Sequence, residues 1–157
     1  MKTIAGMGLG MVLLIGSVAP AHAHAQAGTD IALTRAHIQK ARQAIIADAM
    51  ALTEDESLAF WPAYRDYRMD MARLGDRLVK VITEFVSAGA ALNDEQSNRL
   101  LDEYMDIKAK EVSVKKKHVA IFRKLLPAPK VTRFFQLENK LDAVVNYDLA
   151  ASIPLAH

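Results

Sequence analysis

Two stretches of the chain, LTEDES at residues 52–57 and LNDEQS at residues 92–97, have similar sequences and begin forty positions apart. Each has a leucine, a short polar residue, acidic residues, and Glu or Gln three positions after the short polar one. This order is typical of a capping box, in which two side chains accept the unpaired N–H groups that begin an α-helix. Acidic residues in the first turn also interact favourably with the positive end of the helix dipole. The repeat therefore predicts two helix starts, carried by Leu52, Thr53, Glu56, Leu92, Asn93 and Gln96.

Around these two starts, apolar residues recur at spacings of three and four, and no alternating run bounded by hairpin turns occurs. We predict an all-α fold with helices at about 31–50, 54–86, 94–126 and 129–151. Gly89 suits the end of the second helix, and Pro129 suits the first position of the fourth. Each central helix would extend about 50 Å, which favours an elongated four-helix hairpin-type bundle that forms a dimer.

Each of the first three helices has an apolar stripe that we expect to face the core. Pro62 interrupts the second stripe and predicts a kink, or alternatively a break at Trp61. The expected stripes are Ile31, Ile38, Ile45 and Ile46; then Leu58, Trp61, Tyr64, Tyr67, Met71, Leu74, Leu78, Ile82 and Phe85; then Leu100, Tyr104, Ile107, Glu111, Val114, His118, Ile121 and Leu125.

The N-terminus has the pattern of an export signal. Lys2 precedes an apolar run from Ile4 to Val18 that is shorter than the roughly 20 residues needed to cross a bilayer. We predict cleavage of residues 1–25 after the second of two small-x-small sites, a flexible N-terminus at 26–30, and one domain at 31–157. A retained anchor is the alternative.

Composition excludes several classes of protein. With no cysteine, the chain has no disulfide, thiolate nucleophile or cysteine-bound metal. The formal net charge of +2 becomes +1 without Lys2, too small to attract nucleic acid or acidic lipid. The motifs of nucleotide-binding, hydrolase and zinc-protease sites are missing. We therefore expect no enzyme, no cofactor, no nucleic-acid partner and no stable membrane insertion after cleavage.

Charge is uneven along the third predicted helix. Residues 93–106 hold five acids and one arginine, whereas residues 108–133 hold seven lysines and two arginines against Glu111 alone. Such a basic run attracts acidic or unfolded partners, or is simply a solvated helix face. Large aromatic rings nearby, including Phe60 and Trp61, either line a client surface or pack in the core. The candidate partner-binding residues are Lys115, Lys116, Lys117, Arg123, Lys124, Lys130, Arg133, Phe134 and Phe135.

Two polar groups have alternative interpretations. Glu111 and His118 lie two turns apart on the third stripe, either as a pair satisfied across the bundle or as metal ligands. Arg133, Gln136, Glu138 and Asn139 form either an interhelical hydrogen-bond network, which we favour, or an interaction surface. Further metal ligands could come from His37, His157, Met69 and Met71, although no His-x-x-x-His or Glu-x-x-His spacing occurs.

The doubled helix starts behind an export signal, in a cysteine-free four-helix chain, resemble the LTxxQ-motif periplasmic proteins, which include Spy-type chaperones and CpxP-type stress regulators. The first copy ends in Glu rather than Gln, and the second has Asn in place of Thr. The resemblance implies an antiparallel homodimer of helical hairpins that holds unfolding clients without ATP. Related proteins of similar build bind heavy metals.

These observations predict an exported periplasmic helical protein that binds unfolded or envelope proteins, as an ATP-independent chaperone or envelope-stress modulator. The first alternative is a periplasmic heavy-metal sensor or metal-binding protein. The second is a structural envelope scaffold with no ligand.

Overall fold

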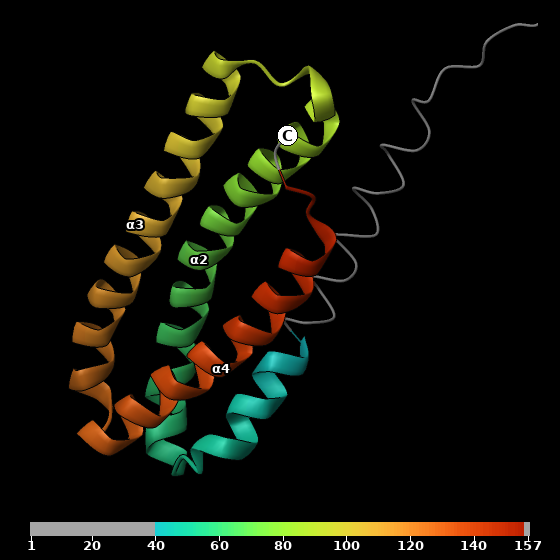
Figure 1. Cartoon of the computed structure of the whole chain (residues 1–157). Helices are drawn as coiled ribbons and strands as arrows, with labels where there is room; N and C mark the ends of the chain where they lie inside the picture. The colour runs from blue at the N-terminus through green and yellow to red at the C-terminus, as the bar shows by residue number, and fades with distance from the viewer. Residues whose placement is uncertain (1–39, 156–157) are drawn as a thin grey trace, which may run out of the picture. The chain divides into compact units, whose positions relative to one another are not determined.

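The fold is all-α, as the sequence predicts. The computed structural model describes residues 40–155, within which no strand occurs. A helix over residues 40–50, called α1 here, is followed by α2 (Glu54–Ala88), the short 3-10 helix η1 (Gly89–Ala91), α3 (Asp94–Leu125) and α4 (Ala128–Ser152). Figure 1 shows this order. The predicted signal peptide, the residues 26–30, the first part of the predicted helix 31–50, His37 and His157 lie outside the described residues.

Both predicted capping boxes are present. The hydroxyl of Thr53 accepts from the backbone N–H of Glu56 at 3.3 Å, and the Glu56 carboxylate accepts from the N–H of Thr53 at 2.8 Å. Asn93 and Gln96 exchange the same two bonds at 2.9 and 3.3 Å. Position N4 is a serine in both copies, so Leu52 has no hydrophobic N4 partner and packs against the core instead.

Helix boundaries agree with the sequence to within two residues, with two corrections. Pro127 is the N-cap of α4, so Pro129 occupies the second helical position and not the first. α2 runs unbroken through Pro62, which rules out the break at Trp61. The proline has no N–H to donate to the carbonyl of Leu58, and that carbonyl loses its helical partner without ending the helix.

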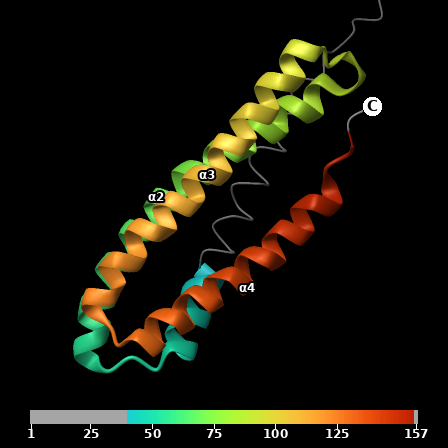
Figure 2. The ribbon, with the colours of Figure 1, turned by 60° about the vertical axis from the view of Figure 1, so that its left-hand side comes forward.

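α2 and α3 run in opposite directions side by side, and α4 turns back from the end of α3 (Figures 1 and 2). Arg77 of α2 reaches both Glu103 and Asp106 of α3, at 2.8 and 2.6 Å, and Arg99 of α3 pairs with Glu84 of α2. These exposed ion pairs lie along the half of the α2–α3 pair nearest η1, where few side chains are buried.

The core lies at the opposite end, where α3 passes to α4. Its aromatic rings pack mostly edge to face: Phe134 lies 4.7 Å from Phe122 and 5.3 Å from Phe60 between ring centroids, a geometry that favours the ring quadrupoles. The buried cluster comprises Ile46, Met50, Phe60, Tyr64, Tyr67, Phe122, Leu126, Val131 and Phe134. Between Leu74 and Leu100 no described side chain is buried.

Parts of the predicted stripes are wrong. Leu58 is 72% exposed, because it precedes Phe60 by two positions and points about 200° away around the helix. Ile45 is exposed beside the buried Ile46. On α3, Tyr104 is exposed, because it lies in the half where little covers the helix, and the fully buried residue beside Ile121 is Phe122.

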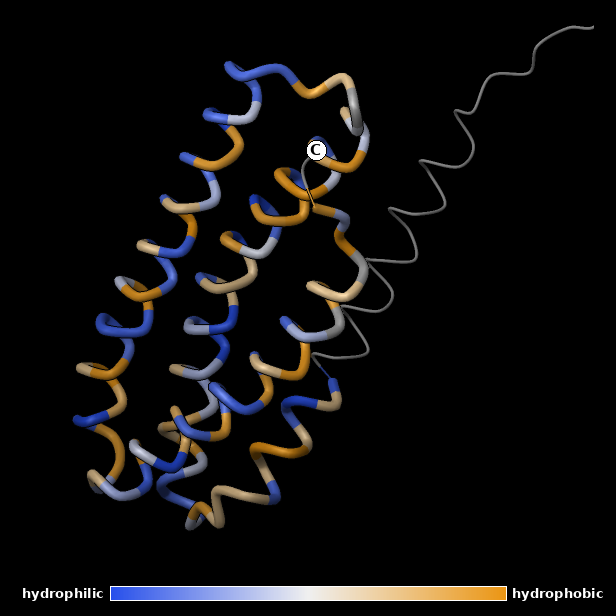
Figure 3. The backbone as a smooth tube through the Cα atoms, in the orientation of Figure 1, coloured by the Kyte–Doolittle hydropathy of each residue, from blue (hydrophilic) through white to orange (hydrophobic). Residues whose placement is uncertain are grey.

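Hydrophobic residues follow stripes and do not fill whole helices (Figure 3). Within residues 40–155, no helix combines the length and the apolar character needed to cross a bilayer.

The link from α1 to α2 contains a strained residue, Ala51, whose φ of +43° lies in the left-handed region that disfavours a Cβ. Lys130 of α4 fixes this link, because its ammonium donates to the carbonyl of Ala51 at 3.0 Å and pairs with Glu56.

Replacing Ala51 by glycine is therefore expected to raise the free energy of unfolding by about 0.5 to 1 kcal/mol, because the relieved strain exceeds the added freedom of the unfolded chain. Urea unfolding followed by circular dichroism measures the change. The same substitution at Ala47, exposed within α1, should lower stability by about 1 kcal/mol. Equal effects at both positions would contradict the argument.

Candidate functional site

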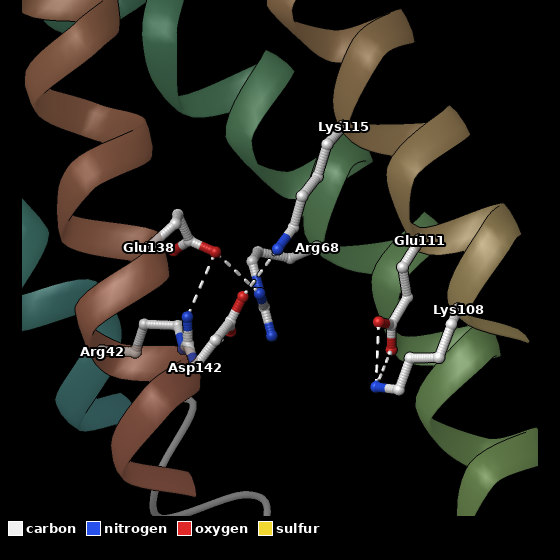
Figure 4. A network of polar contacts seen from close by, with 7 residues as sticks. All are labelled: Arg42, Arg68, Lys108, Glu111, Lys115, Glu138 and Asp142. Carbon is white, nitrogen blue, oxygen red and sulfur yellow. Dashed lines mark hydrogen bonds and ion pairs between the residues drawn. The ribbon is translucent and has the colours of Figure 1, made fainter. Parts of the chain in front are cut away.

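Five charged side chains join α1, α2, α3 and α4 in one network (Figure 4). One oxygen of Glu138 on α4 accepts from Arg42 of α1 at 3.1 Å and from Arg68 of α2 at 3.0 Å. The two oxygens of Asp142 accept from Arg42 and from Lys115 of α3, each at 3.0 Å. The helices are thus held together by charge at the edge of the aromatic core.

This network is deeply buried at its centre, where the side chains of Arg42 and Glu138 are 4% and 1% exposed. Burial lowers the pKa of Arg42, but the nearby carboxylates of Glu138 and Asp142 more than offset this effect and raise the pKa above its ordinary value. Arg42 therefore stays protonated. A pair of this kind is costly to desolvate and much costlier to break on one side only.

Tyr64 and Tyr67 lie beside the network, and the hydroxyl of Tyr64 has no hydrogen-bond partner among the described residues. Burial and the negative charge of Glu138 raise the pKa of Tyr64 to about 12 and also raise the pKa of Tyr67. Neither phenol changes protonation near neutral pH, so these groups serve the packing of the bundle.

A second polar group surrounds Asp70 of α2. Its carboxylate lies 3.0 Å from the buried Nε2 of His118, 2.9 Å from Lys117 and 3.0 Å from the exposed Arg73. The hydrogen bonds from His118 and Lys117 lower the pKa of Asp70 from 3.8 to about 2. The Nε2 of His118 therefore has a partner across the helices, as the first interpretation of the sequence expects, whereas its Nδ1 has none among the described residues. Glu111 departs from that interpretation, because it pairs at 3.0 Å with Lys108 of its own helix.

Stability should accordingly fall in acid. Because the pKa of Asp70 is depressed on folding, its stabilisation is complete above about pH 4 and is lost as the pH falls toward 2. We expect a loss of about 1 to 2 kcal/mol over that window, after allowing for solvent screening. Urea midpoints measured from pH 5 to pH 2 give the slope.

The variant Asp70→Asn should flatten that part of the pH profile. Asp102→Asn is the matched control, because Asp102 is exposed and has no ion-pair partner among the described residues. If both variants kept the slope of the parent protein, Asp70 would not be the source of the acid sensitivity.

The structure divides the predicted partner-binding residues into two groups. Lys115 pairs with Asp142, Lys117 with Asp70, and Lys130 with Glu56, so these three lysines already neutralise acids of their own chain. The other four basic residues of the predicted set are exposed without an ion-pair partner among residues 40–155: Lys116, Arg123, Lys124 and Arg133.

Of the two adjacent phenylalanines, Phe134 is fully buried in the core and is unavailable to a partner. Phe135 is half-buried, and its ring lies 4.9 Å from that of Phe134. One of the two therefore remains for the surface.

Phe135 and Arg123 meet at an open groove between α3 and α4, with a volume of about 470 Å³. The predicted polar cluster on the fourth helix is split by this arrangement: Glu138 belongs to the buried network, whereas Gln136 and Asn139 line the groove. The groove residues are Val119, Arg123, Ala128, Val131, Thr132, Phe135, Gln136 and Asn139.

A second hollow, of about 520 Å³, lies at the N-terminal end of α2 beside Trp61, Pro62 and the exposed Leu58. The indole N–H of Trp61 donates to the hydroxyl of Ser57 at 2.9 Å. The polar atom of the ring is thus satisfied within α2.

Among the described residues, no group of three His, Asp or Glu side chains lies close enough together to hold a metal ion. Met69 is exposed and Met71 is half-buried. His118 and Glu111 have the separate partners given above.

No family model, no curated protein and no solved structure matches the chain.

Proposed function

We propose that this chain is an exported periplasmic protein that binds other proteins, as an ATP-independent chaperone or envelope-stress modulator of the LTxxQ type. The observation that supports the proposal best is the open groove between α3 and α4, which both the half-buried Phe135 and the unpaired Arg123 line. An apolar floor beside free positive charge suits unfolded segments, which expose apolar and acidic side chains together.

The charges around the groove strengthen this proposal. Lys116, Lys124 and Arg133 are also exposed and unpaired within the described part of the chain. By contrast, Asp142, Asp70 and Glu56 already pair with Lys115, Lys117 and Lys130. A positive field therefore survives here although the whole chain is close to neutral, and it speeds the encounter with acidic partners at low salt.

We also propose that two copies form an antiparallel dimer of elongated helical hairpins through the outer face of α3. Leu101, Met105 and Val112 lie four and seven positions apart, hence on one face, and are 53–59% exposed. An antiparallel partner would bring the acidic first half of one α3 opposite the basic second half of the other. This pairing satisfies both apolar surface and charge in one symmetric contact.

The test of binding uses mature protein without nucleotide. It should slow the rise of light scattering when a denatured test protein is diluted into buffer, at near-equimolar ratio and more strongly at low salt. Absence of protection for several test proteins over a range of salt concentrations would refute the proposal. Fractionation of cells that express the full chain tests the periplasmic location separately.

The dimer is tested by sedimentation equilibrium of the parent and of Met105→Glu. We expect the parent to sediment as a dimer and the variant as a monomer. Val144→Glu is the matched control, because Val144 is exposed on α4 and lies off the proposed interface. A monomeric parent protein would overturn this arrangement.

A further inference from the structure

The groove between α3 and α4 has three chemically different surfaces. Its floor is apolar and includes the buried Val131 and the half-buried Phe135 and Val119. The α4 edge presents the exposed polar side chains of Thr132, Gln136 and Asn139, at positions i, i+4 and i+7. The α3 edge carries the guanidinium of Arg123.

We propose that this groove binds an extended peptide segment that places one large apolar side chain on the floor and one Asp or Glu carboxylate on Arg123. The inference rests on the proposed function in one respect only, that the partner is a protein. It adds the site, the conformation of the bound segment and the chemical pattern that the site recognises.

The polar side chains on the α4 edge favour an extended bound segment over a helical one. Side chains at i, i+4 and i+7 share one face of α4, so Thr132, Gln136 and Asn139 form a row of hydrogen-bond donors and acceptors. A helix has already paired its backbone N–H and C=O groups, whereas an extended chain offers both kinds to such a row. Amides that donate and accept together suit that task.

The position of Arg123 indicates that the bound segment has a carboxylate. It is exposed, it lines the groove, and no acidic residue in the described range pairs with it. Its guanidinium presents parallel N–H donors that match the two oxygens of a carboxylate. Lys124 is the next residue along the chain and is likewise unpaired, so the local field favours negative charge at this edge.

The size of the groove agrees with a short recognition element. Its 470 Å³ falls in the lower part of the range of roughly 300 to 1,000 Å³ that is usual for ligand pockets. This is room for one large side chain with the neighbouring backbone. Affinity for a single segment should therefore be modest, and several segments of one unfolded chain could bind in succession.

The experiment uses fluorescence anisotropy with a labelled peptide, Gly-Ser-Thr-Phe-Ser-Glu-Thr-Ser-Gly, and the intact mature protein. We expect saturable binding that weakens about tenfold when Glu is replaced by Gln, the loss expected for one charge-assisted hydrogen-bonded contact. Replacement of Phe by Ser should weaken binding at least as much. Equal binding of the three peptides would overturn the inference.

Two groove variants test the residues. Arg123→Glu should lose about tenfold in affinity for the parent peptide and recover it for the peptide with Arg in place of Glu, a charge swap that a fault in folding would not produce. Thr132→Glu places a second carboxylate beside the groove and should weaken the parent peptide as well. Arg65→Glu is the matched control, because Arg65 is exposed on α2, has no ion-pair partner among the described residues and does not line the groove. An equal loss in the control would mean that only the overall charge matters, and would overturn the inference.

The same variants separate this inference from the proposed function. If the parent protein suppresses aggregation but shows no selective peptide binding, the groove inference is wrong and the binding function stands. If the peptide binds as described and aggregation is not suppressed, the groove inference stands and the chaperone function is wrong.

Discussion

Replacement of Glu138 by glutamine should lower the free energy of unfolding by about 3 to 5 kcal/mol, the range observed when one partner of a buried ion pair is removed. Glu138 is the shared acceptor of Arg42 and Arg68, and its side chain is 1% exposed. Glutamine has nearly the same shape as glutamate, so the loss of stability comes from the missing charge and hydrogen bonding and not from a cavity. Chemical unfolding of the two proteins under identical conditions measures it.

The control is Asp142→Asn in the same network. Asp142 is partly exposed and pairs with the partly exposed Lys115 and with the buried Arg42. Water screens the first pair, and Arg42 keeps Glu138 as a partner, so we expect a loss of only about 1 kcal/mol. The double replacement Arg68→Met with Glu138→Gln should cost less than the sum of the two single changes, because it removes a partly buried cation together with its buried anion. Strict additivity would show that Arg68 and Glu138 are not coupled.

The second large effect is expected at Phe134. Its ring is fully buried and lies within 6.0 Å, between centroids, of the rings of Phe60, Tyr64, Tyr67, Phe122 and Phe135. Phe134→Ala removes the centre of this cluster and leaves a cavity that several helices must collapse to fill. We expect a loss of about 3 to 5 kcal/mol in the free energy of unfolding, measured by urea unfolding.

Two comparisons keep this prediction specific. Phe134→Leu retains most of the buried volume and should cost clearly less than alanine. Phe85→Ala removes a ring that is only half-buried on α2 and should also cost less. Trp61 is the only tryptophan of the chain and its ring lies 5.0 Å from that of Phe60, so its emission reports the disturbance directly. A loss at Phe85 equal to the loss at Phe134 would contradict the placement of the core.

The helix starts could be predicted because the interactions that make them are local. Thr53 and Glu56 are three positions apart, and their two hydrogen bonds are complete within one turn. The same is true of Asn93 and Gln96. Helix type and boundaries therefore follow from a few neighbouring residues. The small errors fall at the end of α2, which extends two residues beyond the prediction, and at the proline-rich link before α4.

The fate of the basic residues could not be predicted, because their partners are distant in sequence. Lys115, Lys117 and Lys130 pair with acids 27, 47 and 74 positions away. Only the packing of the helices decides which lysine meets a carboxylate and which, like Lys116, stays free. The composition of residues 108–133 shows that positive charge is concentrated there but not how much of it remains available.

One feature of the sequence does indicate the buried network, namely a charged residue on the apolar face of α1. Arg42 precedes Ile46 by four residues and Met50 by eight, so its Cβ lies on the core face of α1. A charged residue on an apolar face needs an opposite charge on the helix that it packs against. Glu138 and Asp142, four residues apart, offer two such charges on one face of α4. The pairing itself still required the structure.

The uneven distribution of buried side chains has a consequence for motion. Between Leu74 and Leu100 the two long helices have no buried residue among those described, and exposed ion pairs such as Arg99 with Glu84 contribute little to holding them together. Amide protons in this region should exchange with solvent through partial opening, at a lower free energy than those beside Phe60 and Phe134. The end near η1 can therefore fray and re-form while the aromatic end stays closed, and one chain can behave as two cooperative units.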